Sequence, residues 1–254
     1  MNSIKLTLLA LSLMLASCAK KKIEPEEKIK TCNVKVLEYT HSVSSGITDK
    51  YYYTYDSDHR IIRLDYGKEQ SSNYEVYTYA PQKITWNDYT ERKPLVFTID
   101  ANGRVSEALI SSNNQIGFKY NSDGYLIEVG AGPDKETFDY TNGNLTAVAF
   151  DSSPYATFEY GTLDNNNDLI YSLIYQNKYL YFGSIDSRVL PIGKKSKKLP
   201  VQIITSVGSG EFKNIYDYTY KTDDNGRVTF MSVKWSVPHG GSRTSEYKFI
   251  YECK

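Results

Sequence analysis

The chain has 254 residues, with 30 acidic and 30 basic side chains and a formal net charge of zero at pH 7. This balance argues against nucleic acid as a partner, because phosphate backbones select strongly basic surfaces. Tyrosine is unusually frequent, with 24 copies. The tyrosines recur at regular intervals, and their placement carries most of the information about the fold.

The N-terminus has the pattern of an export signal. Lys5 precedes a short apolar run from Leu6 to Met14. A basic start, a short apolar run and small residues before a cleavage point are typical of a secretory signal peptide, and the run is too short to cross a bilayer about 30 Å thick. The ending Leu15-Ala16-Ser17-Cys18 resembles the lipobox of bacterial lipoproteins. This resemblance implies a signal peptide at 1–17 and a diacylated Cys18; an ordinary signal followed by a chance cysteine is the alternative.

Residues 18–32 are interpreted as a linker between a lipid anchor and the folded domain. The segment from Ile23 to Lys30 is charged, contains Pro25 and has no hydrophobic periodicity, as expected of a tether. Ala19, rather than aspartate, follows Cys18, which by resemblance to enterobacterial sorting rules points to the outer membrane. We therefore expect a lipid-anchored outer-membrane protein, facing either the periplasm or the exterior.

Cys32 and Cys253 lie at the two ends of the remaining sequence, whose domain is predicted at 33–254. Export to an oxidising compartment permits a disulfide between them. Such a bond would close a loop of about 220 residues and contribute on the order of 4–5 kcal/mol in the chain-entropy model. Two free thiols are the alternative, because the sequence does not show whether the Cα atoms approach each other.

A repeated unit of alternating aromatic residues and a polar turn runs through the domain. In one copy Phe97-Thr98-Ile99-Asp100 precedes Ala101-Asn102-Gly103-Arg104-Val105. The alternation has the period of a β-strand with both large side chains on one face. The turn places glycine where a left-handed conformation is needed, and the next residues begin a returning strand. The anchor residues recur about every twenty positions, at Tyr55, Tyr79, Ile99, Tyr120, Tyr140 and Tyr160, and again at Tyr220.

Serial hairpins of this kind predict an all-β domain, an antiparallel up-and-down meander of about 12–16 strands. A sheet of so many strands must curl, split into two sheets or close into a barrel, and closure removes the exposed edge strands. The expected fold is a closed or strongly curved, barrel-like sheet with one helix or loop insert. His59 occupies the glycine position of the first unit, where a left-handed residue is tolerated less well.

The motif Tyr-x-Tyr-Asp followed by Gly-Arg-Val resembles the YD and RHS repeats of secreted bacterial proteins. A closer resemblance is to a bacterial lipoprotein family of unknown function with a porin-like fold, which combines a lipobox, an Asn-Gly-rich hairpin array and a late Leu-Pro segment, here Lys197-Lys198-Leu199-Pro200-Val201. It implies a barrel or curved sheet over about residues 33–254 and no activity. The sequence departs from the YD consensus at His59 and around Ala80-Pro81-Gln82. A membrane-spanning barrel is disfavoured, because spanning strands need about 9–11 residues.

Residues 163–201 lack the hairpin signature and form the expected insert. Asp168 is a candidate N-cap for a helix over 169–175, whose apolar residues share one face. The lysine-rich stretch 194–198 is predicted to be a basic loop. The insert either fills the lumen of the barrel or lies on the surface with a small core of its own.

The sequence shows no catalytic or metal-binding motif. His41, His59 and His239 lack metal-ligand spacing, and Pro238-His239-Gly240-Gly241 has no accompanying nucleophile elbow and is interpreted as a turn. The Asp- and Asn-rich stretches fit turn chemistry better than a calcium loop. We therefore expect a non-catalytic protein without a cofactor or metal. A glycan-active hydrolase with an unrecognised carboxylate pair is the enzymatic alternative.

Tyrosine rings can stack on sugars, although most of these rings are assigned to cross-strand packing. The candidate ligand-binding residues are aromatic side chains outside the repeat, namely Tyr171, Tyr175, Tyr179, Tyr181 and Trp235. The leading hypothesis is an envelope lipoprotein that binds a glycan, peptide or protein partner. The alternative is a structural scaffold of an envelope complex that uses 194–198 as a contact.

Overall fold

The computed structural model describes residues 31–41, 46–89, 94–111, 114–131, 134–166, 189–207, 212–237 and 240–253. A compact unit extends from Cys32 to Lys254, and all the strands lie in it. Within the described residues the strands are β1 (Cys32–Thr40), β2 (Thr48–Tyr55), β3 (Ile61–Tyr66), β4 (Tyr74–Ala80), β5 (Lys83–Asp88), β6 (Leu95–Ile99), β7 (Val105–Ser111), β8 (Asn114–Tyr120), β9 (Leu126–Ala131), β10 (Asp134–Thr141), β11 (Asn144–Phe150), β12 (Ser153–Asp164), β13 (Lys198–Val207), β14 (Phe212–Thr222), β15 (Val228–Val237) and β16 (Gly241–Cys253).

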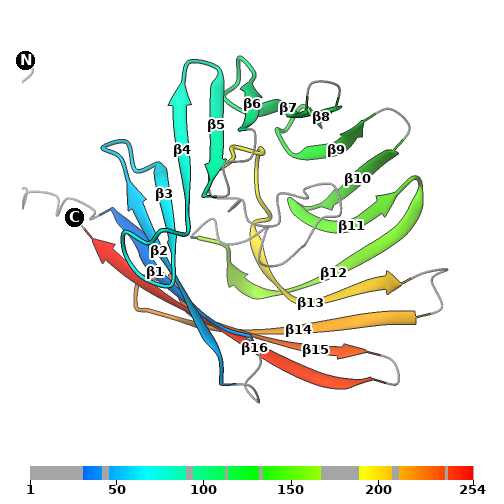
Figure 1. Cartoon of the computed structure of the whole chain (residues 1–254). Helices are drawn as coiled ribbons and strands as arrows, with labels where there is room; N and C mark the ends of the chain where they lie inside the picture. The colour runs from blue at the N-terminus through cyan, green and yellow to red at the C-terminus, as the bar shows by residue number, and fades with distance from the viewer. Residues whose placement is uncertain are drawn as a thin grey trace, which may run out of the picture. The chain divides into compact units, whose positions relative to one another are not determined.

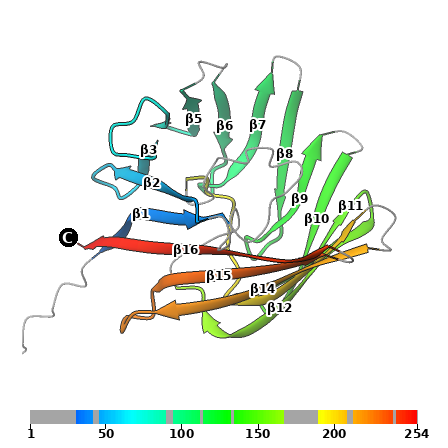
Figure 2. The same cartoon turned by 60° about the horizontal axis from the view of Figure 1, so that its bottom comes forward.

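These strands form one closed antiparallel barrel (Figure 1). Each strand pairs with its neighbours in sequence, and β1 pairs with β16 to complete the ring. The prediction of an all-β, up-and-down fold is therefore confirmed, with a closed rather than an open sheet. Strands β12 to β16 have 10 to 13 residues and lie side by side in Figure 2, whereas β2 to β11 have five to eight.

A disulfide lies at the seam where the ring closes. Cys32 and Cys253 are partners in the β1–β16 ladder, their Cα atoms are 4.0 Å apart, and 221 positions separate them in sequence. Cys32 is thus the first residue of β1, because the ladder with β16 extends to it. The predicted linker was assigned residues 18–32, whereas Cys32 belongs to the strand.

Alternate residues of each strand point into the barrel and form its core. Phe97 in β6, Val129 in β9 and Met231 in β15 are completely shielded from solvent. Burial of side chains of this size contributes about 1.5–3 kcal/mol each. Other buried residues on the inward faces are Leu37, Tyr53, Leu64, Tyr77, Ala108, Phe118, Phe138, Val148, Phe158, Ile203, Tyr218 and Phe249. The period-two repeats therefore build the interior of the barrel.

The anchor residues form a second layer, next to the turns. Tyr55, Tyr79, Ile99, Tyr120, Tyr140, Tyr160 and Tyr220 are partly buried and pack against the core. Hydroxyl groups of several of these tyrosines reach a neighbouring hairpin: Tyr120 donates to the Val105 carbonyl at 2.7 Å, and Tyr220 donates to the Pro200 carbonyl at 2.8 Å. The same bond recurs from Tyr55, Tyr79, Tyr160 and Tyr251. Successive repeats are thus joined by side chains as well as by the sheet.

The chain between β12 and β13 contributes to the core, as a wide barrel requires. Val189, Leu190 and Ile192 are buried in the same cluster as the strand residues. The described end of the insert therefore lies against the inside of the barrel. Because β12 extends to Asp164 and β13 begins at Lys198, the insert is narrower than the predicted 163–201.

The helix expected over 169–175 lies outside the described residues. In the part of the chain that is described, no helix is long and apolar enough to cross a bilayer.

The outward faces of the strands carry charged pairs. Glu38 of β1 contacts Lys50 of β2 at 2.9 Å and Lys248 of β16 at 3.3 Å. A second set joins Lys119, Glu128 and Lys135 across β8, β9 and β10. These ion pairs thus face outward, where Leu109, Val201 and Ile250 are also exposed.

Candidate functional site

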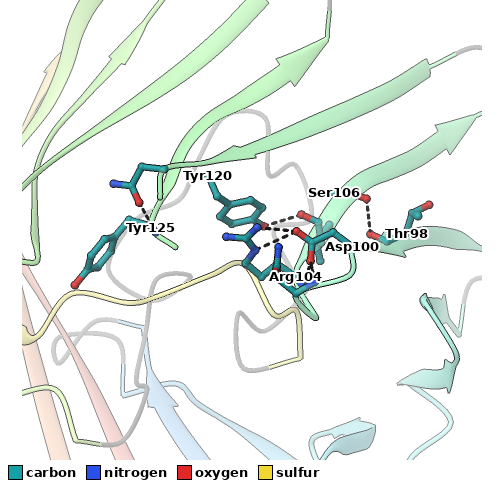
Figure 3. Close-up of polar contacts among 9 residues, drawn as sticks. Thr98, Asp100, Arg104, Ser106, Tyr120 and Tyr125 are labelled. Atoms are coloured by element: carbon teal, nitrogen blue, oxygen red, sulfur yellow. Dashed lines mark hydrogen bonds and ion pairs between the residues drawn. The ribbon is translucent and has the colours of Figure 1, made fainter. Parts of the chain in front are cut away.

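Three of the described hairpin turns are organised by an Asp–Arg pair that reaches an aromatic ring of another hairpin, and Figure 3 shows one of them. Asp100 Oδ1 accepts hydrogen bonds from the backbone N–H groups of Asn102 and Arg104 at 2.8 Å, and Oδ2 accepts one from the Arg104 side chain at 2.9 Å. The Arg104 guanidinium lies 4.3 Å from the centroid of the Tyr120 ring. The same arrangement joins Asp56, Arg60 and Tyr79, and also Asp223, Arg227 and Tyr251.

These carboxylates are held in the ionised form by their own turns. Burial by itself would raise the pKa of Asp100, but hydrogen bonds from Arg104 and Asn102 outweigh burial and lower the pKa below its usual value. The pKa values of Asp56 and Asp223 are lowered in the same way. Two of the oxygen-rich stretches, those at Asp56 and Asp223, are thus engaged by backbone and arginine donors.

A buried carboxylate, Glu75 in β4, lies inside the barrel. Its side chain is 1% exposed and accepts hydrogen bonds from the hydroxyls of Tyr66 and Tyr77 and from the indole N–H of Trp86, the last at 3.0 Å. Burial, and after it the charge of Glu75, raises the pKa of Tyr66. A carboxylate with donors on both oxygens stabilises the packing of β3, β4 and β5, and it is poorly placed to exchange protons with a substrate.

A hollow of about 450 Å³ lies between the turns of the early hairpins and the segment 189–195. Its apolar wall is made by Ile84 and Ile99 from the strands and by Val189 and Leu190 from the segment. The volume is within the range of small-molecule sites, about 300–1,000 Å³. This hollow is a candidate for a binding site.

Backbone hydrogen bonds hold the segment in place. The Val105 N–H donates to the Pro191 carbonyl at 3.0 Å, and the Lys194 N–H donates to the Gly124 carbonyl at 2.9 Å. Gly193 has a φ of +85°, and a Cβ atom there would lie 2.6 Å from the Gly124 carbonyl oxygen and 2.7 Å from the Tyr120 ring. The inner wall of the hollow therefore depends on a glycine at position 193.

Two turns beside the hollow hold larger residues in the left-handed conformation. His59 has a φ of 61° and Gln82 a φ of 57°, and both line the hollow. Most of the other repeat turns have glycine there, at Gly103, Gly124, Gly143 and Gly226. A left-handed non-glycine residue costs about 1–2 kcal/mol, and such strain concentrates at binding sites. The two departures from the repeat consensus thus coincide with the hollow.

The charged residues that line the hollow are basic. They are Arg60, Lys83 and Lys195 among the described lining residues, which include neither aspartate nor glutamate. The Arg60 guanidinium also contacts Asp56 at 2.6 Å and Asp58 at 3.1 Å, both outside the described lining. The charge of Arg60 is therefore compensated within its own turn.

The lysine-rich stretch 194–198, predicted to be a basic loop, is docked along the turns. Lys194 forms a parallel bridge with Tyr125, and the Lys197 N–H donates to the Gly143 carbonyl at 3.1 Å. The hydroxyl of buried Ser196 accepts a hydrogen bond from the Leu145 N–H at 3.0 Å. These contacts occupy the backbone hydrogen-bonding groups of the stretch, so few backbone donors and acceptors are left to bind a partner.

The predicted ligand-binding residues are placed only in part. Trp235 of β15 is half-buried and stacks on Tyr216 of β14, with ring centroids 6.2 Å apart and planes inclined by 4°. Its indole N–H has no hydrogen-bond partner among the described residues, and the Arg243 guanidinium lies 5.9 Å from its ring. Trp235 does not line the hollow. Tyr171, Tyr175, Tyr179 and Tyr181, together with Cys18, lie outside the described residues.

Solved structures share this fold. A porin-like protein from Bacteroides uniformis aligns with a TM-score of 0.63 at 18% identity, over 86% of this chain and 96% of that protein. A porin-like protein from Bacteroides vulgatus aligns with a TM-score of 0.54 at 15% identity, over 86% of this chain and 98% of that protein. No family model and no curated protein matches the chain. The expected porin-like fold is thus supported, while the lipidation and the relationship to YD repeats stay predictions.

Proposed function

We propose that this chain is a non-catalytic, lipid-anchored outer-membrane protein that binds a small ligand in the hollow beside its early hairpin turns. The observation that carries the proposal is the ligand-sized hollow between the strands and the segment 189–195. Among its described lining residues are His59 and Gln82, two of the six described non-glycine residues with a positive φ; Gln70, Asn142, Asp151 and Ser152 lie outside the lining. Strain of this kind is retained where the geometry serves a purpose other than stability.

The outward-facing ion pairs support anchoring by acyl chains. A barrel that contacts lipid carries an apolar band outside and polar residues inside. Glu38 with its lysine partners, and Glu128 with its partners, occupy the outward faces here. A lipid on Cys18 would hold such a barrel at the membrane surface. Metabolic labelling with a palmitate analogue should mark the wild-type chain and leave Cys18→Ser unlabelled; equal labelling would contradict this anchor.

Ligand binding is tested by filling the hollow. Ala80 is exposed at the end of β4 and lines the hollow, so Ala80→Trp places an indole there with little effect on the core. Thr157→Trp, at an exposed position of β12, is the control. Thermal unfolding is screened against sugars, short peptides, carboxylates and phosphates. At 100 times its dissociation constant a ligand adds about 2.7 kcal/mol of stability.

A ligand of the hollow should stabilise the wild type and Thr157→Trp, and it should leave Ala80→Trp unchanged. Equal stabilisation of all three proteins would place the ligand elsewhere. A folded wild type that responds to none of the four classes would count against the proposed function.

A glycan site at Trp235 is the second candidate. The ring is half-buried and lies parallel to that of Tyr216, with ring centroids 6.2 Å apart, and such an aromatic pair suits a sugar that stacks on a ring. The indole N–H is buried and has no partner among the described residues. Trp235→Phe keeps a ring and removes the donor, while Trp235→Ala removes both. A glycan-array signal that survives both substitutions would rule out this site.

A further inference from the structure

The end of the barrel opposite the repeat turns has an inner surface of its own. In an up-and-down barrel successive turns lie at opposite ends, so the turn between β15 and β16 lies away from the repeat turn at 223–227 that precedes β15. The hollow lies at the end of the repeat turns, because His59 and Gln82 of those turns line it. A site beside the β15–β16 turn is therefore separate from the hollow.

Trp235 faces the inside of the barrel near this turn. It alternates along β15 with Met231 and Val233, which are buried in the core, and alternate side chains of a strand share one face. Its cross-strand partners are Tyr216 of β14 and Arg243 of β16, so these side chains lie on the same inner face. The rings of Tyr216 and Trp235 are half-buried, and part of each ring is thus open to a ligand.

Polar groups surround the two rings. Burial raises the pKa of Tyr216, and hydrogen bonds with the side chains of Thr205 and Asn214 partly offset this effect. The hydroxyl of Ser245 lies on the same face, because Ser245 is the cross-strand partner of Val233. Hydroxyl and amide groups beside aromatic rings suit a sugar, which has an apolar C–H face and many hydroxyls. An aliphatic chain would leave these polar groups without hydrogen bonds.

Arg243 adds a positive charge to this surface. Its guanidinium lies 5.9 Å from the centroid of the Trp235 ring, the residue is exposed, and it forms no ion pair within the described part of the chain. Asp49, on the inner face of β2 at the same end, contacts His41 instead. An arginine beside an aromatic ring presents its N–H groups as a planar fork that fits a carboxylate. The charge of Arg243 is therefore matched by an anionic ligand.

We infer that this inner surface binds an acidic carbohydrate, with a sugar ring against Tyr216 and Trp235 and its carboxylate on Arg243. This inference rests on the second candidate function, a glycan site at Trp235, and specifies the chemical class of its ligand. The ligand is a uronate-containing oligosaccharide, because a uronate carries its carboxylate directly on the sugar ring. A carboxylate alone would leave the two rings uncovered, and a neutral sugar would leave the guanidinium without an anionic partner.

The experiment measures binding by isothermal titration to the full chain in lipid nanodiscs, with empty nanodiscs as the background. The probes are oligosaccharides of galacturonate, glucuronate and mannuronate, each compared with the neutral oligosaccharide of the same stereochemistry, linkage and length. Acetate carries the carboxylate alone. We expect at least one uronate to bind about tenfold more tightly than its neutral counterpart and than acetate, and its binding to weaken as salt is raised.

Substitutions locate the carboxylate of the ligand. Arg243→Gln should weaken binding of the uronate about tenfold and leave binding of the neutral counterpart unchanged, because it removes one charge-assisted contact. Lys234→Gln is the matched control, since it removes one positive charge from an exposed position on the outward face of β15, and it should leave binding unchanged. Equal weakening by the two substitutions would show a general charge effect and overturn the inference.

The remaining outcomes separate the ligand class from the site. Equal binding of a uronate and its neutral counterpart, lost in a folded Trp235→Ala variant, would overturn the acidic class and keep a glycan site at Trp235. Absence of binding by all three uronates to the folded protein would overturn the inference. The ligand site in the hollow is tested separately by Ala80→Trp, and that test does not depend on either outcome.

Discussion

Replacement of Gly193 by alanine tests whether the segment 189–197 is held by an approach that only glycine allows. Gly193 has a φ of +85°, and the added Cβ would lie 2.6 Å from the Gly124 carbonyl oxygen and 2.7 Å from the Tyr120 ring. The left-handed conformation alone costs alanine about 1–2 kcal/mol, and overpacking costs about 1–3 kcal/mol. The Gly124 oxygen belongs to the backbone and the Tyr120 ring is partly buried, so neither group can move away easily. We expect Gly193→Ala to lower the free energy of unfolding by about 2–5 kcal/mol.

Gly103→Ala is the matched control, because Gly103 has a φ of +76° and nothing lies within 4 Å of its added Cβ. Gly103→Ala should lower the free energy of unfolding only by the cost of the left-handed conformation, about 1–2 kcal/mol. Urea unfolding followed by tryptophan fluorescence and circular dichroism measures both variants. Equal losses in the two variants would refute the reasoning from close contact, and they would leave the backbone conformation as the whole effect.

Three further predictions concern the turns and the seam. His59→Gly should raise the free energy of unfolding by up to about 1–2 kcal/mol, because it relieves a left-handed side chain; a lower urea midpoint would contradict this. Cys253→Ser should lower the free energy of unfolding by about 5 kcal/mol in the chain-entropy model, and a reductant should reproduce that loss in the wild type but have no effect on the variant. The pKa of Asp100 is lowered in the folded state, so its contribution is present above the unfolded value near pH 3.9 and is lost as the pH falls through the lower, folded value. Asp100→Asn should therefore flatten the acid limb of a stability–pH curve, and parallel curves would speak against the Asp–Arg pairing.

Much of the fold was predictable because each repeat encodes its hairpin locally. The spacing of Phe97, Ile99 and Gly103 specifies a strand, its inward face and the turn that follows, and these features depend on only a few residues. Closure of the sheet into a ring was harder to predict from the sequence. Cys32 and Cys253 indicated that the ends are near each other, but the pairing of β1 with β16 depends on the summed geometry of all the hairpins between them.

The hollow was not predictable from periodicity, because its lining comes from distant parts of the sequence. His59, Gln82, Ile99 and Leu190 belong to four segments, and no local pattern shows that they meet. The sequence contained one indication of the hollow, because His59 occupies the position at which the repeat consensus has glycine. A residue that breaks a strong repeat marks a place where another requirement outweighs local stability.

Trp235 illustrates the opposite case. It was selected from sequence because it lies outside the repeat, and the structure places it in a stack with Tyr216. Neither its partnerless indole N–H nor the Arg243 guanidinium beside it follows from spacing alone, because these depend on cross-strand register.

The order of strands around the ring also determines how the chain can assemble. Every described strand pair except β1–β16 joins neighbours in sequence, so the sheet can grow by adding one hairpin at a time at a small entropic cost. Closure of β1 on β16 is the step that requires a long-range search, across the 221 positions that separate Cys32 from Cys253. Until that step, an incomplete ring exposes two unpaired edges and an aromatic interior, which are the features that promote aggregation. In the closed ring the β1–β16 ladder pairs both of these edges, and the Cys32–Cys253 bond joins them covalently.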